Sequence, residues 1–414
     1  MGSKKLKAVA VRGNQKVPIA DIEAANKLRK EYLIELMAAE PGKESPFERM
    51  RKYGTAAASH LSAHSGDSPV KNWGGVGVFD YPDASGVSGD AVIANQERDE
   101  ACWHCPQACE GILKEGTGEY KYVAGTRRPE YETVAAFGAI CLNNNTESIA
   151  KANDICNRYG LDTISAGATI AFAMECYENG LITKKDTDGI ELTWGNHKAL
   201  VAMTEKMAKR EGFGDILADG VKVAAERIGK GAEQYAVHIG GQELGMHDPK
   251  QVTSTVRPHP FPSAARYQMD ATPGRHNQSF GPSGFRGHVV NAAGLCSFGY
   301  GRVDPEKFLA GFMRVVTGWD RSMDELLKAG ERVATMRHVF NLREGINPLE
   351  LKVHPRIIGT PPQKEGPLSG VTADIEAQSL WNLGALDWDR ISTKPSKKKL
   401  LALGLEDVAK DLWP

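Results

Sequence analysis

Three cysteines in one short segment are the residues best suited to chemistry. Cys102, Cys105 and Cys109 have the spacing C-x2-C-x3-C within the run ACWHCPQAC. Thiolates at this spacing can surround one soft metal centre from a single loop, because the first two converge and the third returns one helical turn later. The segment therefore supplies three ligands, and a fourth must come from elsewhere in the chain.

The spacing favours an iron–sulfur cluster, with zinc as the alternative. A zinc site could be completed by His104 or Cys296, since C-x2-C pairs are common in zinc sites. This chain has one such pair, and the third cysteine, with Trp103 and Pro106 beside the pair, favours iron. The other cysteines, in apolar or helical stretches, are expected to be small buried thiols: Cys141, Cys156 and Cys176.

Length and composition describe an ordinary globular protein. The chain has 414 residues, 25% of them charged, with 51 Lys and Arg against 52 Asp and Glu. These values exclude a disordered chain or a disulfide scaffold and predict neither a nucleic-acid nor an anionic-membrane partner. The longest apolar stretches, such as residues 164–174, fall short of the roughly 20 residues of a membrane span. Without an apolar signal core at the N-terminus, a cytoplasmic protein is expected.

The elements that must position the cysteines are mainly helices. Apolar residues recur at steps of three and four in several stretches, two of which end at the helix-stop glycines Gly160 and Gly180. The alternation in residues 6–11 predicts a strand, while residues 55–89 and 258–285 read as irregular. The predicted helical stretches are residues 21–40, 146–160, 163–180, 198–210, 215–228, 305–316 and 323–343.

Five motifs in order resemble the tungsten-containing aldehyde:ferredoxin oxidoreductase family: MGSKKLKAVAVRG, ACWHCPQAC, RPEYETVAAFG, NRYGLDTISAG and NAAGLC. The resemblance implies a mainly α fold with few strands, made of two helical domains like domains 2 and 3 of that family, at residues 1–240 and 241–414. It also implies tungsten, or molybdenum, between two pterins beside one 4Fe-4S cluster. The β-rich pterin-base domain of the family has no counterpart in this sequence, and three explanations stay open: the chain is a fragment, it is one half of a split enzyme whose other polypeptide supplies that domain, or it is complete.

The resemblance assigns the cofactor ligands residue by residue. Cys102, Cys105 and Cys109 would be three cluster ligands and Cys296 the fourth. Two turns of the family's form Asp-x-x-Gly-Leu-Asp/Cys would contact the pterins, and both have Asn in place of the first Asp. That exchange keeps an acceptor oxygen, adds an amide donor and removes a charge. The implied pterin-contacting residues are Asn157, Gly160, Leu161, Asp162, Asn291, Gly294 and Leu295.

The same resemblance suggests the acid–base residues. Glu132, in RPEYE, matches the family carboxylate near the metal, and the apolar residues after it predict a raised pKa. Taken alone, a glutamate at this position would be expected to interact with a helix dipole. The family's histidine near the metal is assigned to His276, with His259 and His247 as alternatives.

The implied function is oxidation of aldehydes to carboxylic acids, with electrons passing through the cluster to ferredoxin or to an iron–sulfur electron-transfer subunit. Two alternatives remain open. One is the catalytic subunit of a tungsten benzoyl-CoA reductase-like enzyme, which would add electrons to an aromatic ring. The other is an iron–sulfur electron-transfer subunit without catalysis.

Overall fold

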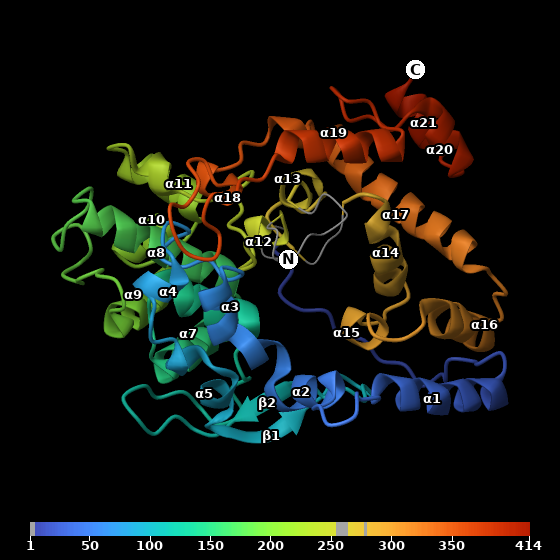
Figure 1. Cartoon of the computed structure of the whole chain (residues 1–414), viewed down its shortest axis with the longest axis horizontal. Helices are drawn as coiled ribbons and strands as arrows, with labels where there is room; N and C mark the ends of the chain where they lie inside the picture. Colours follow the sequence, from blue (N-terminus) through green and yellow to red (C-terminus); the bar gives the residue numbers. More distant parts are fainter. Residues whose placement is uncertain (1–4, 254–263, 277–279) are drawn as a thin grey trace.

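The computed structural model describes residues 5–253, 264–276 and 280–414 and is mainly helical. Figure 1 shows most of the first half of the chain on one side and most of the second half on the other, with a short two-stranded sheet at the lower edge of the first. The antiparallel sheet pairs β1 (Gln96–Glu100) with β2 (Glu110–Leu113). The first helices are α1 (Ile22–Leu36), α2 (Pro46–Tyr53), α3 (Ser59–Ser65), α4 (Gly77–Asp80) and α5 (Gly89–Ile93).

The N-terminal helix packs on the second half of the chain. Asp21 caps α1, because its Oδ1 accepts a hydrogen bond from the Ala24 amide at 2.9 Å. The buried Tyr32 and Leu36 of α1 share one apolar cluster with Phe308, which precedes α16 (Gly311–Thr317). Figure 1 shows α1 running alongside α16. The N-terminal and C-terminal parts of the chain are therefore packed together.

Three sequence predictions about local structure are wrong. Residues 6–11 form no strand: they have no regular secondary structure and are exposed, and no strand of the described residues pairs with them. Residues 55–89 contain α3 and α4 and end at the first residue of α5, although they read as irregular. Residues 215–228 are divided at Gly220 between α10 (Phe213–Leu217) and α11 (Val221–Ile228).

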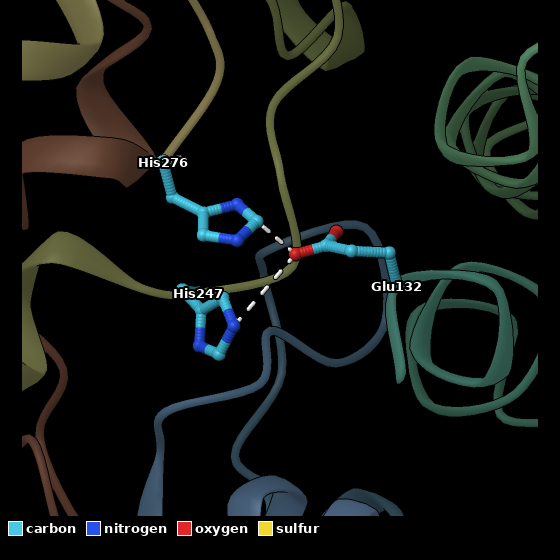
Figure 2. A group of neighbouring side chains, drawn as sticks. All are labelled: Glu132, His247 and His276. Carbon is cyan, nitrogen blue, oxygen red and sulfur yellow. Dashed lines mark ion pairs between the residues drawn. The ribbon is translucent and has the colours of Figure 1, made fainter. Parts of the chain in front are cut away.

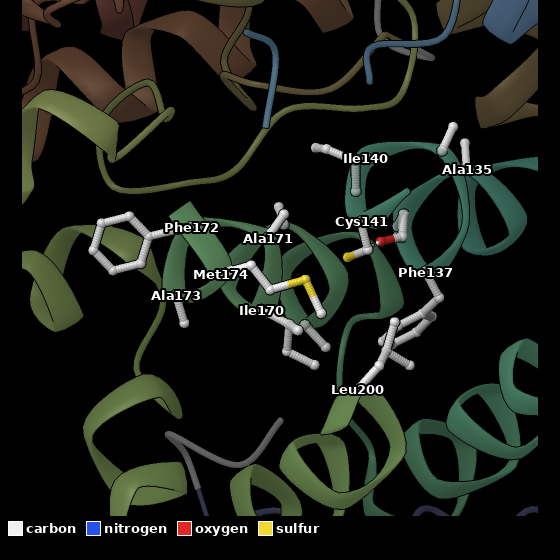
Figure 3. Packing of buried hydrophobic residues seen from close by; sticks show 14 of the residues in the cluster. Ala135, Phe137, Ile140, Cys141, Ile170, Ala171, Phe172, Ala173, Met174 and Leu200 are labelled. Atoms are coloured by element: carbon white, nitrogen blue, oxygen red, sulfur yellow. Dashed lines mark hydrogen bonds between the residues drawn. The ribbon is translucent and has the colours of Figure 1, made fainter. Parts of the chain in front are cut away.

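The largest core surrounds α8 (Thr163–Glu178), whose middle residues are buried on all sides. Figure 3 shows Ala171 and Met174 of α8 near Phe137 of α6 (Tyr131–Phe137) and near Leu200 of α9 (His197–Lys209). Gly167 permits close packing, because a Cβ there would lie 2.1 Å from the Ala136 carbonyl oxygen. The core thereby fixes α6, which carries Glu132 in its first turn. Helix α7 (Thr146–Tyr159) covers the same core.

The second half is built on α17 (Met323–Arg343), whose start is capped by a Ser322 and Glu325 capping box. Helix α14 (Phe285–Ala292) crosses it closely, since a Cβ at Gly330 would lie 2.1 Å from the Phe285 carbonyl oxygen. The remaining helices are α12 (Pro249–Thr253), α13 (Arg266–Met269), α15 (Ser297–Tyr300), α18 (Pro355–Ile358), α19 (Ile375–Leu386), α20 (Lys397–Ala402) and α21 (Glu406–Leu412).

The predicted division at residue 240 remains a prediction. The core around α8 also takes in Leu244, Met246 and Tyr267 from beyond that position. Across the described ranges, every helix is too short or too polar to cross a membrane.

Candidate functional site

The cysteine segment is the connection between β1 and β2. It begins after Glu100 and ends before Glu110, which are paired across the sheet. His104 (φ 56°) and Ala108 (φ 47°) adopt the left-handed conformation that reverses the chain within so few residues. The segment is tied to its surroundings at Gln107, whose Nε2 donates to the Phe47 carbonyl at 2.9 Å. Cys102, Cys105 and Cys109 therefore lie on one anchored loop.

Cys296 approaches this loop from the other half of the chain. It stands at the N-cap of α15, and its side chain makes no capping hydrogen bond. The pKa of Cys109 is raised to about 11, mainly by burial and in addition by the charges of Glu130, Cys105 and Cys296. That electrostatic interaction means the fold brings Cys296, 187 residues away, to the predicted cluster loop.

The separation of the sulfur atoms favours a cluster over zinc. All four cysteines belong to the described residues, and no three of their sulfur atoms lie within 4.8 Å of one another. Counting the ring nitrogens of His104 as a further ligand does not complete such a group of three. Sulfurs bound to one zinc ion at about 2.3 Å would be nearer together. A four-iron cluster binds each thiolate through a different iron and spaces the sulfurs more widely.

The two predicted pterin turns have the same backbone geometry. In the first, α7 ends at Gly160 (φ +76°), and the Leu161 amide donates to the carbonyl of Cys156 at 2.9 Å. In the second, Gly294 has φ +71°, and the Leu295 amide donates to Val290 at 2.9 Å. Each leucine amide thus bonds the carbonyl five residues earlier, as in a Schellman helix stop. The interpretation of Gly160 as a helix stop is compatible with a ligand-binding turn.

The residue after each turn starts the next helix. Asp162 caps α8, since its Oδ1 accepts from the Ile164 amide at 2.8 Å, and its Oδ2 forms an ion pair with Arg275. Cys296 has the same position at α15 without such a bond. Asn157 donates to Asn153 at 3.3 Å within α7, and Asn291 is exposed at the end of α14.

Glu132 lies between two histidines. Its Oε2 accepts a hydrogen bond from the Met246 amide at 2.7 Å, and its Oε1 lies 3.1 Å from His276 Nδ1. The same Oε1 is 3.7 Å from His247 Nε2. Figure 2 shows Glu132 pointing from its helix toward both rings, which come from two separate segments. The third candidate, His259, lies outside the described residues.

The buried surroundings change the protonation of this group. Burial raises the pKa of Glu132, against the opposing effects of the His247 charge and the Met246 amide. Burial, with the nearby charge of His247, lowers the pKa of His276 to about 3. For His247, burial favours a lower pKa, but the hydrogen bond and charge of Asp67 outweigh it, so its pKa is raised.

Two atoms of this group are available to a ligand. Oε1 of Glu132 and Nδ1 of His276 are buried and, despite their short separation, form no well-directed hydrogen bond with any group. A buried polar atom without a partner costs free energy, which a bound substrate or cofactor can recover.

A cavity of about 570 Å³ joins these features. Glu132 and Asp162 line it together with Glu110, which lies 3.9 Å from the sulfur of Cys102. The cavity therefore extends from Glu132, past the first turn, to Glu110 beside the cysteine loop. The other lining residues are Arg127, Arg128, Glu130, Thr133, Asn153, Asn157, Thr163 and Ile164.

Sequence reasoning missed Asp67 as part of this site and ranked His247 only as an alternative. The two are 180 positions apart, and Nδ1 of His247 lies 3.0 Å from Asp67 Oδ1. Asp67 falls in a segment that read as irregular, and no local motif marks it. Arg275, whose guanidinium also donates to the Glu243 carbonyl, links the His276 segment to the first turn through Asp162.

Comparison with known proteins gives the family. The family model for aldehyde ferredoxin oxidoreductase, domains 2 and 3, matches residues 30–405. The chain belongs to this family, which confirms the predicted fold class and resemblance. The tungsten-containing aldehyde ferredoxin oxidoreductase of Pyrococcus abyssi (strain GE5 / Orsay) is 32% identical over 443 residues, covering 98% of this chain and 68% of that protein.

Two further proteins are similar over different extents. The WOR-like subunit of the aliphatic sulfonate oxidoreductase of Pyrococcus furiosus is 30% identical over 315 residues, covering 72% of this chain and 47% of that subunit. The solved active site complex BamBC of benzoyl coenzyme A reductase, bound to 1,5-dienoyl-CoA, shares the fold with a TM-score of 0.72. That match has 20% identity and covers 100% of this chain and 69% of the other.

Proposed function

We propose that this chain contributes the acid–base residues and the cluster ligands of an oxidoreductase that converts aldehydes to carboxylic acids. The observation that carries the proposal is the cavity lined by both Glu132 and the first turn, with its Glu110 edge at the cluster loop. Membership of the aldehyde ferredoxin oxidoreductase family supports the same reaction class.

The described residues fit the implied cofactors. Four cysteines from two parts of the chain lie close enough to interact electrostatically, and no three of their sulfurs are within 4.8 Å of one another. Cys102, Cys105, Cys109 and Cys296 would hold a 4Fe-4S cluster. The cavity has room for a pterin beside Asn157 and Asp162, and Arg127 and Arg128 are the cationic groups in a wall that also carries four carboxylates. A bound tungsten (or molybdenum) bis-pterin would supply the two-electron redox change.

The chain's own residues would handle binding and protons. Glu132 lines the cavity; one of its oxygens is fixed by the Met246 amide, and the other, Oε1, is buried without a hydrogen bond. As a base, this oxygen would take a proton from the water that adds to the aldehyde carbonyl. His276, neutral at working pH because of its low pKa, would orient the substrate oxygen by hydrogen bonding. The balance is aldehyde and water to carboxylic acid, two protons and two electrons.

The electrons would leave one at a time through the cluster to a partner. Ferredoxin, or an iron–sulfur electron-transfer subunit, is the partner we propose, since the named relatives include a ferredoxin oxidoreductase and a protein that is itself a subunit.

Aldehyde-dependent reduction of a viologen dye, by protein purified with its iron and tungsten, tests the reaction. We expect turnover with aldehydes and none with aryl-CoA thioesters in the reductive direction. Metal-replete protein that is inactive with every aldehyde but reduces an aryl-CoA would contradict the proposal in favour of the benzoyl-CoA reductase-like alternative. The protein can also be purified alone and after coexpression with a family N-terminal domain. Iron without tungsten in both preparations would indicate an electron-transfer subunit.

A further inference from the structure

His247 contacts a carboxylate with one ring nitrogen and faces a second carboxylate with the other. Its Nδ1 lies 3.0 Å and 3.2 Å from the two oxygens of Asp67, and its Nε2 lies 3.7 Å from Glu132 Oε1. Asp67 is also tied by its main chain, because its carbonyl accepts a hydrogen bond from the Asp248 amide at 2.5 Å. The aspartate and the histidine are thus held together by side chain and backbone.

The ring of His247 has a fixed orientation. The ring of Tyr131 stacks on it, with centroids 4.5 Å apart and planes inclined by 21°. The Tyr267 hydroxyl donates to the His247 carbonyl at 2.8 Å, and the Tyr131 hydroxyl donates to the Met246 carbonyl at 2.7 Å. The side of the imidazole that faces Glu132 in Figure 2 is therefore set by packing.

This geometry limits where protons can be. An ionised carboxylate only accepts hydrogen bonds, so Asp67 requires a proton on Nδ1 of His247. A neutral His247 then turns the lone pair of Nε2 toward an oxygen of Glu132, and two acceptors would face each other. One further proton, on Nε2 or on Oε1, removes this conflict. The two groups are 3.7 Å apart, and such distances commonly shorten when substrate binds.

We propose that Asp67 and His247 form a positioning pair that keeps one proton shared between His247 Nε2 and Glu132 Oε1. With the shared proton on His247, Glu132 is ionised and can accept the proton that the attacking water loses; this accepted proton then passes to bulk water, since each turnover releases two protons. The role in turnover rests on the function proposed above, whereas the sharing of the proton does not. Asp67 acts through His247 and does not touch the substrate cavity.

Other charged and titratable groups surround the pair, and their effects differ in sign. Asp67 and Glu132 favour a cationic His247, while Arg266 disfavours it. The His247 charge favours an ionised Glu132 more strongly than Asp67 opposes it. Removing the charge of Asp67 should therefore move the shared proton onto Glu132. Among the described residues, the charged and titratable groups that act on His247 and Glu132 are Asp67, Tyr131, Arg266, Tyr267, Arg275 and His276, and Asp248 interacts with Asp67.

The test is Asp67→Asn in the full chain with its cofactors, followed by infrared titration of the Glu132 carboxylic acid band. The band is assigned to Glu132 if it is absent from the spectrum of Glu132→Gln. We expect the band in Asp67→Asn to persist to a pH at least about one unit higher than in the wild type. Asp80→Asn is the matched control, because Asp80 is an exposed carboxylate that accepts from the Val76 amide at 2.6 Å. It should leave the titration unchanged.

Kinetics provide the second readout. In Asp67→Asn, kcat should fall roughly 10- to 100-fold with a nearly unchanged KM, and the acidic limb of its pH profile should move to higher pH. An unchanged infrared titration in Asp67→Asn overturns the inference, even if kcat falls. A wild type that shows no aldehyde turnover overturns the proposed function, while the infrared result still decides the shared proton. If Asp67→Asn does not fold, His247→Gln should produce the same upward shift of the band.

Discussion

The two ends of the cavity are built in different ways. The acid–base end rests on packed structure: Glu132 begins α6, which lies against α8 in the largest core, and its carboxylate is fixed by a backbone amide. The cluster end consists of a hairpin loop and a helix start, where Cys102 and Cys296 are exposed. The comparison teaches that helix packing and a backbone amide hold the acid–base group, whereas the cysteines stand on two segments, a hairpin loop and a helix start.

The largest effect is expected at the cluster end. Cys296→Ser should abolish or greatly reduce cluster binding, because no other described cysteine can reach the loop from the second half of the chain. Iron content and visible absorption measure this. Cys156→Ser, which alters a buried core thiol, is the control and should keep its iron. Full iron content in Cys296→Ser would contradict the expectation that cluster binding requires Cys296.

A large effect on turnover without loss of cofactor is expected at the acid–base end. Glu132→Gln should lower kcat roughly 10²- to 10⁴-fold, since it removes the base but keeps the side-chain size and the Met246 contact. Iron and tungsten contents should match the wild type. Turnover like that of the wild type would remove Glu132 from the mechanism, and loss of metal would show that the two ends are not independent.

Gly167→Ala tests whether packing fixes the acid–base end. A Cβ there would lie 2.1 Å from the Ala136 carbonyl oxygen, so α8 and α6 must separate, at a cost of about 1–3 kcal/mol. Urea unfolding measures the free energy. Gly287→Ala, in α14 with open space around its Cβ, is the control and should be neutral or slightly stabilising. Equal stability of Gly167→Ala and the wild type would contradict the packing argument.

Glu132 should also make stability depend on pH. Its pKa is raised in the folded protein, so its stabilising contribution is complete below its ordinary pKa of about 4.3 and is lost as pH rises through the folded-state value. The Tm of Glu132→Gln should therefore improve relative to the wild type between pH 4 and neutral pH. A Tm difference that does not change with pH would contradict the raised pKa.

The smallest expected effect concerns the two matching turns. Gly160→Ala and Gly294→Ala each place a Cβ at φ near +70° in open space, so only backbone strain of about 1 kcal/mol is expected in both. Urea unfolding of the two variants should give similar losses. A much larger loss in one of them would show that the turns are equivalent in backbone only.

Local features of the fold were predictable from the sequence. Helices α7, α9 and α17 lie within two residues of their predicted positions, because apolar periodicity and helix-stop residues act over one or two turns. The strand prediction for residues 6–11 was wrong because a strand requires a partner strand. The break at Gly220 was not predicted because the apolar pattern continues through it. The cysteine loop and Glu132 could be proposed because short motifs carry them.

By itself, the sequence determined the helical class, the family, the ligand-bearing loop and the two helix-stop turns, all of which depend on residues a few positions apart. The tertiary structure decided which distant residues meet. It brought Cys296 to the cluster loop, chose His247 and His276 as the neighbours of Glu132, and paired His247 with Asp67 from 180 positions away. Such contacts follow from helix packing in the core, which no local pattern contains.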